Sequence, residues 1–416
     1  MMSNYIESKK NNTGHQIPLI GFLVLFSILA PALLHTNQPE FLVDRLGISI
    51  LDASYFDTVL YASYLIIGIL TAIISNQIGK RKVFISIGTI GSAIFYFLMT
   101  LTDIFPLILV FRFIQGGFTV LCWQTLMTVI LDLSSEKNRG RNMGIFGIFL
   151  ASAMGGGPVL GGFLASWGVF APYYFASILS LMAFIITLIL LKEPENLSSK
   201  PSLEENMNIV FRNPRVIIPG IFNFVDRLHI GFILFILPFF LQMELGVQPE
   251  LRGMVLGIFA LPFIILQYPV GKLSDKIGRY RLLIFGSIGT GIMLAVTGII
   301  GSYGLFFIII AFFMIGICNG FTGPPAMALV GDIVEKEDNP VGMGFFNLLG
   351  NVGIIVGPLI GGILINYTNF VIAFFVAGLF EILSLLAIIL ILAIVFKENP
   401  LKMASHEDKN YRSSEK

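Results

Sequence analysis

Five ionisable side chains lie inside long apolar segments of this chain: Arg112, Asp226, Arg227, His229 and Glu381. A charged side chain at the middle of a bilayer costs about 2.5–3.5 kcal/mol on insertion scales, so each of these residues needs a partner or a function. Acids and imidazoles can bind and release protons, and a neighbouring cation controls when they do so. We therefore predict that the five residues form the proton-coupling machinery of the chain.

Three of these residues share one short segment with Asn223. Asn223, Asp226 and His229 recur every three residues and so form one stripe on a helix, which Arg227 flanks. We expect Asp226 to alternate between a protonated form and an ion pair with Arg227 or Arg112, because burial favours the neutral acid and a cation favours the carboxylate. The alternative is a permanent Asp226–Arg227 pair that only fixes the interface between the two halves.

His229, Glu381 and Arg112 could each have a structural role instead of a role in proton transfer. His229 could be a neutral hydrogen-bonding residue, and structural pairing is the favoured interpretation of Glu381. Arg112 could be held by backbone carbonyls of a neighbouring helix. Because arginine does not lose its proton in proteins, Arg112 would act by controlling a nearby carboxylate or by holding an anionic substrate.

The segments that carry these residues are long enough to cross a membrane. The chain has 416 residues, of which 56% are apolar and 12% are charged, against about 25% charged in soluble proteins. Apolar runs of about 20 residues indicate transmembrane helices, since hydrocarbon requires every backbone polar group to be satisfied internally. We predict an all-α polytopic membrane protein with twelve such helices, near 17–38, 55–75, 83–102, 104–131, 142–168, 170–191, 216–241, 252–271, 281–300, 303–331, 342–367 and 370–396.

Lys and Arg fall mainly on one side of this topology. Of 26 such residues, 22 lie on one side, and only Arg45 and Arg252 lie outside the membrane on the other. The positive-inside rule predicts that both termini are cytoplasmic in a multi-pass protein of the cell membrane. The net charge of +1 gives no indication of a partner. Cys122 and Cys318 lie in apolar segments, which predicts packing residues rather than a disulfide.

Two motifs recur at nearly the same displacement and indicate a duplication. Asn76-Gln77-Ile78-Gly79-Lys80-Arg81 matches Asp275-Lys276-Ile277-Gly278-Arg279-Tyr280 after 199 residues, and Gly157-Pro158-Val159-Leu160-Gly161-Gly162 matches Gly357-Pro358-Leu359-Ile360-Gly361-Gly362 after 200. The predicted divisions are a cytoplasmic tail 1–16, a six-helix half 17–191, a cytoplasmic linker 192–215, a second six-helix half 216–396 and a cytoplasmic tail 397–416.

The motifs resemble those of the major facilitator superfamily. Gly271 to Arg279 is similar to its signature loop G-x-L-a-D-r-x-G-r, and Arg112-Phe113-Ile114-Gln115-Gly116 is similar to R-x-x-q-G. The run from Gly157 to Gly162 resembles the antiporter motif of the twelve-helix drug:proton branch. The resemblance implies two parallel halves and a substrate site near the midplane between them. The chain departs from the pattern at Asn76, where the family has Asp, and at Ala72, where it has Gly.

The signature loops are predicted to control a cytoplasmic gate. A carboxylate such as Asp275 can bind the N-terminus of a helix from the other half, here near Arg141 and Asn142. The alternative is that Asp275 only orients Lys276 and Arg279 in its own loop. The gating candidates are Asp275, Gly278, Arg279, Asn76, Gly79, Arg81 and Arg141.

Glycine and proline within the membrane predict close helix contacts or hinges rather than a phosphate-binding loop, since no Gly-Lys-Ser/Thr follows. The candidates are Gly157, Pro158, Gly161, Gly357, Pro358 and Gly361. The first helix lacks a carboxylate at mid-membrane, and its acids Glu40 and Asp44 sit at the outer end. A proton site is therefore expected elsewhere.

The resemblance places the pocket wall on the first, fourth, seventh and tenth helices, with lower-ranked candidates on the second and eighth. The substrate-binding candidates are His35, Asn37, Gln38, Trp123, Gln124, Asn223, Phe232, Phe235, Asn319, Tyr64 and Gln267. The 39 phenylalanines of the chain would suit a lipophilic substrate.

These observations predict a secondary transporter that works by alternating access and exports small lipophilic compounds or drugs in exchange for protons. The alternatives are a symporter or exporter of a polar metabolite such as a sugar or organic anion, and a receptor or lipid-handling scaffold that does not transport. We expect no enzyme activity, cofactor, metal or nucleic-acid partner. The expected partners are a small-molecule substrate, protons and the lipid bilayer, and we expect a monomer.

Overall fold

The protein is helical throughout the part that the structure describes. The computed structural model describes residues 2–135, 138–193, 213–335 and 338–397. The side chains of residues 2–15, 72, 73, 76, 77 and 340 are outside this description, as are most of the predicted linker and the predicted C-terminal tail. No β-strand occurs in the described ranges, so the all-α prediction is confirmed.

The helices cover the predicted membrane segments in the predicted order. Eleven helices in the described ranges are long and apolar enough to cross a membrane, and a shorter apolar helix, Gln16–Ala32, lies at the first predicted segment. The chain is thus a multi-pass membrane protein. The elements are α1 (Met2–Ala32), a π-helix η1 (Pro39–Asp44), α2 (Ile50–Ile78), α3 (Arg81–Leu98), α4 (Phe105–Asp132), α5 (Arg139–Ala165), α6 (Ala171–Leu190), a 3₁₀ turn η2 (Pro214–Val216), α8 (Ile217–Met243), α9 (Pro249–Ile277), α10 (Arg279–Gly301), α11 (Leu305–Gly320), α12 (Gly323–Ile333), α13 (Asn339–Tyr367) and α14 (Phe370–Ile394). Because α1 begins at Met2, it includes residues predicted to form a tail.

The chain divides into two compact units. Unit 1 comprises Met1–Ile48, Tyr55–Lys200 and Gln248–Met254, and unit 2 comprises Ser49–Ser54, Pro201–Val247 and Val255–Lys416. The first turn of α2 therefore belongs to unit 2 and the rest of α2 to unit 1. Conversely, the first turn of α9 belongs to unit 1 and the rest of α9 to unit 2.

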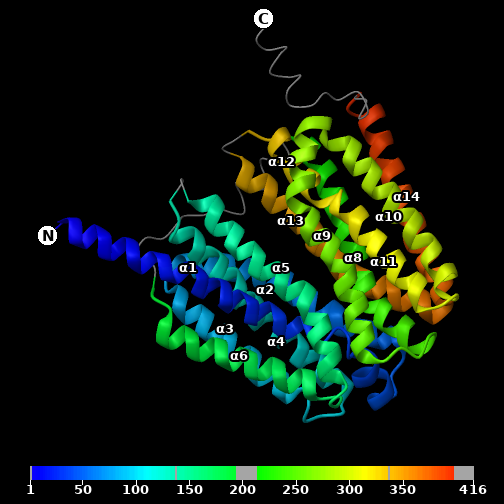
Figure 1. Ribbon diagram of the computed structural model, residues 1–416, viewed down its shortest axis with the longest axis horizontal. Helices are drawn as coiled ribbons and strands as arrows, with labels where there is room; N and C mark the ends of the chain where they lie inside the picture. The colour runs from blue at the N-terminus through cyan, green and yellow to red at the C-terminus, as the bar shows by residue number, and fades with distance from the viewer. Residues whose placement is uncertain (1, 136–137, 194–212, 336–337, 398–416) are drawn as a thin grey trace, which may run out of the picture. The chain divides into compact units, whose positions relative to one another are not determined.

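The same packing scheme occurs in both units. In unit 1, α1 packs along α5, and α3 packs against both α4 and α6. In unit 2, α8 packs along α13, and α10 packs against both α11 and α14. Figure 1 shows these neighbouring helices side by side within each unit. The repeated contacts agree with the duplication indicated by the two motifs.

The tenth predicted segment consists of two helices. α11 ends at Gly320 and α12 begins at Gly323. Pro324 and Pro325 follow at the start of α12, and neither can donate a backbone N–H to the preceding turn. The chain therefore breaks around Thr322, a site that we had predicted to lie within one continuous helix.

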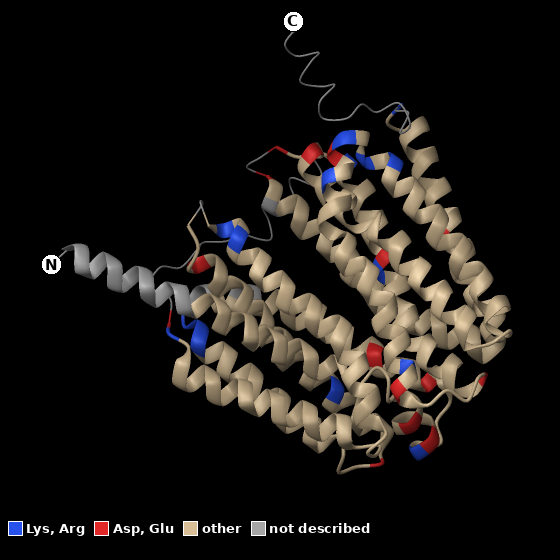
Figure 2. Ribbon diagram, viewed as in Figure 1, with Lys and Arg blue, Asp and Glu red and all other residues tan. Residues whose placement is uncertain are grey.

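The outward faces of the helices are apolar. On α6, exposed Ile178, Met182, Ile185 and Ile189 recur at helical spacing, whereas Ala183 is fully buried. A helix with an apolar exposed face is suited to lipid rather than water. Figure 2 shows most Lys, Arg, Asp and Glu near helix ends within each unit, with few in the helix interiors. The few interior charges are the basis of the candidate site.

Candidate functional site

Asp57 and Arg112 form a buried ion pair in unit 1. Arg112 Nη2 lies 3.6 Å from Asp57 Oδ1, and neither side chain is exposed. His35 Nδ1 lies 3.4 Å from Asp57 Oδ2, to which Gln38 Nε2 also donates a hydrogen bond at 2.7 Å. The guanidinium carbon of Arg112 lies 4.3 Å from the ring centroid of Phe56. We call His35, Gln38, Asp57 and Arg112 the Asp57 cluster.

Three parts of unit 1 bring the Asp57 cluster together. Asp57 lies two turns into α2, which begins at Ile50, and Arg112 lies two turns into α4. His35 and Gln38 come from the turn between α1 and η1. A short π-helix directly after this turn leaves both side chains buried beside α2. The cluster therefore depends on tertiary packing rather than on one sequence motif.

Arg112 is held in position by side chains of α3 and α4. Its Nη1 donates to Gln115 Oε1 at 2.9 Å. The Gln115 amide donates to Tyr96 Oη at 2.9 Å and to Thr119 Oγ1 at 2.7 Å, and Thr119 Oγ1 lies 3.1 Å from Ser92 Oγ. These contacts replace the backbone carbonyls that we had considered as partners of Arg112.

Several polar atoms of the cluster have no hydrogen-bond partner among the described residues. They are Gln38 Oε1, Asp57 Oδ1 and the Nε and Nη2 of Arg112, all of which are buried. At 3.6 Å, Nη2 and Oδ1 attract each other electrostatically but are too far apart for a hydrogen bond. Unsatisfied buried polar atoms are costly, so this pair is suited to binding a proton or another polar group.

Asp57 was missed because its helix begins earlier than predicted. A second membrane segment starting near residue 55 places Asp57 at the membrane border, whereas α2 starts at Ile50 and buries it completely. Glu40 and Asp44, the acids expected at the outer end of the first helix, lie on η1. The sequence did contain one indication of this site: Asp57 lies two residues after the predicted start of the second apolar segment at residue 55.

Unit 2 holds the other four predicted proton-coupling residues. Asp226 Oδ1 accepts a hydrogen bond of 3.1 Å from Thr322, at the break between α11 and α12. His229 Nδ1 lies 3.0 Å from Glu381 Oε2 on α14. Arg227 is half-buried on α8. The structure therefore gives Glu381 the polar partner expected of structural pairing, and gives Arg112 a carboxylate, Asp57, that the sequence analysis had not considered.

Some predicted pocket residues pack inside the units. Phe232 and Phe235 are fully buried, and the Phe232 ring lies 5.8 Å from that of Phe374 on α14. The Asn223 amide donates to the Phe346 carbonyl on α13 at 2.7 Å, and the Asn37 amide donates to the Val169 carbonyl at 2.7 Å. We had predicted these side chains to line a pocket, because the sequence alone does not distinguish a residue that lines a pocket from one that contacts a neighbouring helix.

Other candidates retain unused polar atoms. Trp123 Nε1, Gln124 Oε1 and Asn319 Nδ2 are buried and lack a hydrogen-bond partner among the described residues. The carbonyl of the Asn319 amide accepts from Thr290 at 2.8 Å. Tyr64 is half-buried against Tyr61, with ring centroids 6.1 Å apart. Gln267 is also half-buried.

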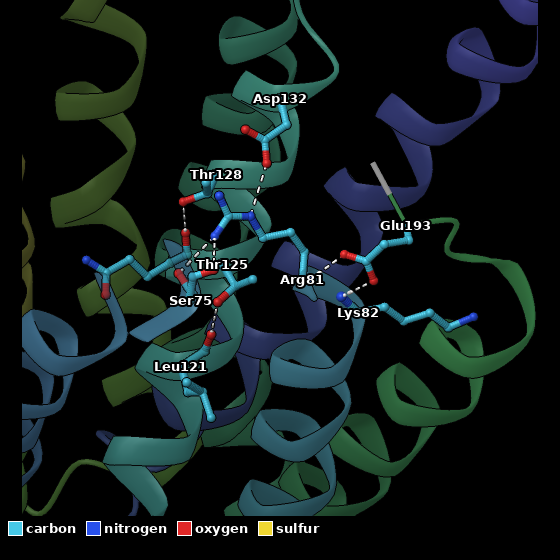
Figure 3. Close-up of polar contacts among 9 residues, drawn as sticks. Ser75, Arg81, Lys82, Leu121, Thr125, Thr128, Asp132 and Glu193 are labelled. Atoms are coloured by element: carbon cyan, nitrogen blue, oxygen red, sulfur yellow. Dashed lines mark hydrogen bonds and ion pairs between the residues drawn. The ribbon is translucent and has the colours of Figure 1, made fainter. Parts of the chain in front are cut away.

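The signature loop of unit 1 is built on the buried side chain of Arg81 (Figure 3). Its Nη1 donates to the Ser75 carbonyl at 2.6 Å and to Ser75 Oγ at 3.1 Å, and its Nε donates to Asp132 at 3.1 Å. The carboxylate of Glu193 accepts from the backbone N–H groups of Arg81 and Lys82 at the start of α3. The loop is thereby tied to the ends of α2, α4 and α6.

Unit 2 repeats this arrangement with a shift of one residue. Arg279 donates from Nη1 to Ser274 Oγ at 2.5 Å and from Nε to Asp332 at 3.0 Å. Arg81 and Arg279 are each the first residue of their helix. The alignment of the two loops had paired Arg81 with Tyr280, and the structure corrects this pairing because Lys80 is an additional residue in unit 1.

The other gating candidates have simpler environments. Asp275 is 59% exposed and forms an ion pair of 2.5 Å with Arg279 in its own loop, as the alternative interpretation expected. Arg141 is exposed, and the Asn76 side chain is outside the described residues. Gly79 and Gly278 have φ angles of 71° and 96°, which favour glycine.

The predicted glycine positions lie where helices approach closely within a unit. A Cβ on Gly157 would lie 2.3 Å from the Cβ of Ala32, and one on Gly161 would lie 2.0 Å from the Leu33 carbonyl oxygen. In unit 2, a Cβ on Gly357 would lie 2.3 Å from the Leu228 carbonyl oxygen. Pro158 and Pro358 lie inside α5 and α13, and Gly361 faces Ile236 of α8.

Comparison with known proteins gives consistent results for most of the chain. The sequence model of the Major Facilitator Superfamily matches residues 20–248 and 220–413. The chain is 26% identical over 313 residues to an uncharacterized MFS-type transporter, YfkF, of Bacillus subtilis (strain 168), covering 73% of this chain and 78% of the relative. It is 23% identical over 303 residues to the class E tetracycline resistance protein of Escherichia coli, covering 71% of this chain and 74% of the relative.

Solved structures agree with the fold. The crystal structure of the nucleoside transporter NupG superposes with a TM-score of 0.75 at 13% identity, over 90% of this chain and 98% of that one. At this identity, the likeness concerns the arrangement of helices.

Proposed function

Because the chain belongs to the major facilitator superfamily, we propose that it exports small lipophilic compounds in exchange for inward-moving protons. The observation that carries this proposal is the buried Asp57 cluster, in which a carboxylate and a guanidinium face each other with unsatisfied atoms. Similarity to a tetracycline resistance protein supports the export of a lipophilic compound. In this proposal the protein is a transporter and not an enzyme.

Asp57 is the proposed proton acceptor. As a carboxylate it is stabilised by Arg112, His35 and Gln38. A proton that binds Oδ1 forms an O–H bond and neutralises the negative charge of Asp57. The electrostatic attraction between Asp57 and Arg112 would then be weaker. Alternating access then requires that the proton be gained from one side of the membrane and released to the other.

Asp226 is a second proposed proton carrier, and it lies in unit 2. Its carboxylate accepts from Thr322, whose hydroxyl also lies 2.9 Å from the Asn319 carbonyl. The single hydroxyl proton of Thr322 cannot form a full hydrogen bond with both oxygens at once. Protonation of Asp226 would therefore leave this hydroxyl hydrogen-bonded to the backbone carbonyl of Asn319. This arrangement links the charge of Asp226 to the break between α11 and α12.

The membrane potential supplies enough energy for this exchange. One charge that crosses 100 mV releases about 2.3 kcal/mol, which corresponds to a roughly fiftyfold concentration ratio per proton. The orientation that we propose places the basic loops of both units on the cytoplasmic side.

The test is substrate-dependent proton flux in proteoliposomes with an imposed pH gradient. We expect lipophilic cations or neutral drugs to drive protons in the opposite direction. The Asp57→Asn variant should lose this flux while retaining substrate exchange between two compartments of equal pH. The Asp52→Asn variant removes an acid from the first turn of the same helix and should behave like the wild type.

Arg112 favours one alternative substrate class. Its free Nε and Nη2 could bind the carboxylate of an organic anion, since guanidinium groups form paired hydrogen bonds with carboxylates. Proton movement in the same direction as an organic acid would support that symporter and contradict the exporter. A complete absence of flux with drugs, sugars and acids would contradict both.

A further inference from the structure

His229 and Glu381 form a buried pair between α8 and α14 that the transport cycle described above does not use. The two side chains are 1% and 7% exposed, and Nδ1 of the imidazole lies 3.0 Å from Oε2 of the carboxyl group. The Phe380 ring lies beside the imidazole, with its centroid 6.3 Å from that of the His229 ring. Both helices belong to unit 2.

The hydrogen-bond pattern fixes the number of protons that this pair needs. The other ring nitrogen of His229, Nε2, lies 3.0 Å from the backbone carbonyl oxygen of Ala377. A carbonyl oxygen can only accept, so Nε2 carries a hydrogen. One further proton is then required between Nδ1 and the carboxyl group, either on the imidazole or on the acid.

Loss of that proton would leave two electron-rich groups facing each other. Nδ1 and a carboxylate oxygen, both electron-rich, would then lie 3.0 Å apart, and a negative charge would remain in a site with almost no access to water. Burying an uncompensated charge is strongly unfavourable. With one proton, the pair is neutral overall in either tautomeric form.

The neighbouring helices supply little charge that could replace the proton. Asp226 and Arg227 lie on α8 and have opposite signs. The described part of α14 has no ionisable residue other than Glu381. On α13 the ionisable residue is Tyr367, which is the last residue of that helix.

The remaining ionisable groups lie farther along their helices. Arg279, Tyr280 and Arg281 lie in the first turn of α10, whereas the part of α10 that faces α14 next to Glu381 is Gly291, which contacts Ile382, about 15 Å farther along the helix. Asp332, near the end of α12, pairs with Arg279, and Cys318 on α11 faces Gly289 of α10.

We propose that His229 and Glu381 are a proton-binding site that holds one proton between α8 and α14 and keeps these helices together. Besides this pair and the His229–Ala377 hydrogen bond, aromatic contacts join the two helices, with Phe374 packed against Phe232 and Phe240. Loss of the proton at alkaline pH leaves only the His229 Nε2–Ala377 hydrogen bond as a polar attachment of α14 and sets Nδ1 against a carboxylate that repels it. This site acts on the stability of unit 2 and does not depend on the proposed direction or substrate of transport.

The test compares thermal unfolding of the purified full-length chain between about pH 5 and about pH 9. In Glu381→Gln, the amide can donate to Nδ1 without any added proton, so the polar attachment becomes independent of pH. We expect the apparent Tm of the wild type to fall at the alkaline end by at least about 3 °C relative to this variant. The matched control is Glu244→Gln, which removes an exposed carboxylate just after α8 and should follow the wild type.

Parallel profiles of the wild type and Glu381→Gln would overturn the proposal, because they would show that the pair neither gains nor loses a proton in this range. If Glu381→Gln does not fold, the double variant His229→Gln/Glu381→Gln provides the same comparison with two neutral amides. A profile of the double variant that still falls like the wild type would equally overturn the proposal. Transport assays are not needed for either outcome.

Discussion

Two buried arginines of unit 1 are satisfied to different degrees, and this difference suggests different roles. Arg81 donates to Ser75 and Asp132 and starts a helix. Arg112 bonds Gln115 but leaves Nε and Nη2 unused beside Asp57. A fully bonded buried charge is suited to a fixed structural contact. A partly bonded one can change its partner at smaller cost, as a transport site requires.

The Arg81→Ala variant should lose about 3–5 kcal/mol of stability, because it leaves the buried carboxylate of Asp132 without its guanidinium. Apparent Tm in detergent, followed by the loss of monodisperse protein on heating, measures this effect. The matched control is Lys82→Ala, since the Lys82 side chain is solvent-accessible and contacts only the Leu188 carbonyl among the contacts we describe. Equal Tm values for the two variants would show that the Arg81 network is not structurally important.

Sequence analysis identified individual charged residues better than their partners. Arg112, His229 and Glu381 were candidates because they are ionisable residues in apolar segments. Their partners come from other helices, and spacing along one helix contains no information about which helix packs next to it. Asp57 was missed for a related reason: an error of five residues in a helix start moves a side chain by more than one turn.

At the scale of elements, glycines set how closely the long helices approach. Gly353 and Gly357 of α13 lie against the backbone of α8, where a Cβ would come within 2.1 Å and 2.3 Å of carbonyl oxygens of Phe224 and Leu228. Without a hydrophobic driving force between helices in lipid, close backbone packing contributes much of the attraction. The α8–α13 contact therefore depends on the absence of side chains at these positions.

We expect Gly353→Ala to destabilise unit 2 by about 1–3 kcal/mol, since neither backbone can move away without opening the contact. Gly344 lies on the same helix with nothing within 4 Å of an added Cβ. Gly344→Ala should therefore be neutral or should stabilise the helix by up to about 1 kcal/mol. Chemical or thermal unfolding of the two variants distinguishes a packing effect from a general effect on helix propensity. Similar behaviour of both variants would contradict the packing argument.

Helix positions were largely predictable, because a membrane helix needs about 20 apolar residues and the loops between them are polar. The break between α11 and α12 was not predicted, since hydropathy stays high through Phe321. Pro324 and Pro325 were visible in the sequence and indicate such a break. Hydropathy averaged over a window of residues does not show that Pro324 and Pro325 lack the backbone N–H groups that a continuous helix needs.

At the scale of the whole molecule, basic loops lie at matching ends of the two units. Lys80 and Arg81 lie at the start of α3, and Gly278 and Arg279 at the start of α10. From the excess of Lys and Arg in these loops we propose that each of them lies on the cytoplasmic side of the membrane.

Cysteine labelling in intact cells tests this orientation. Lys80 is exposed just before α3, and the Asp103 side chain is 80% exposed beyond its other end. We expect Asp103→Cys to react with a membrane-impermeant maleimide, and Lys80→Cys to react only with a permeant one. Native Cys122 is buried and hydrogen-bonded to Ser27, so its background reaction should be low. The reverse labelling pattern would invert the topology.

The shifted signature loops show what the duplication has preserved. Ser75 and Ser274, Arg81 and Arg279, and Asp132 and Asp332 occupy the same places in the two units, yet they are separated by 199, 198 and 200 residues. Small insertions and deletions have thus accumulated around a triad whose geometry has survived. The two units therefore share the three-way contact between the ends of neighbouring helices rather than the spacing of the motif. Chimeras that exchange the two halves should therefore be joined according to this triad, because a splice based on the aligned loops would leave one arginine out of register.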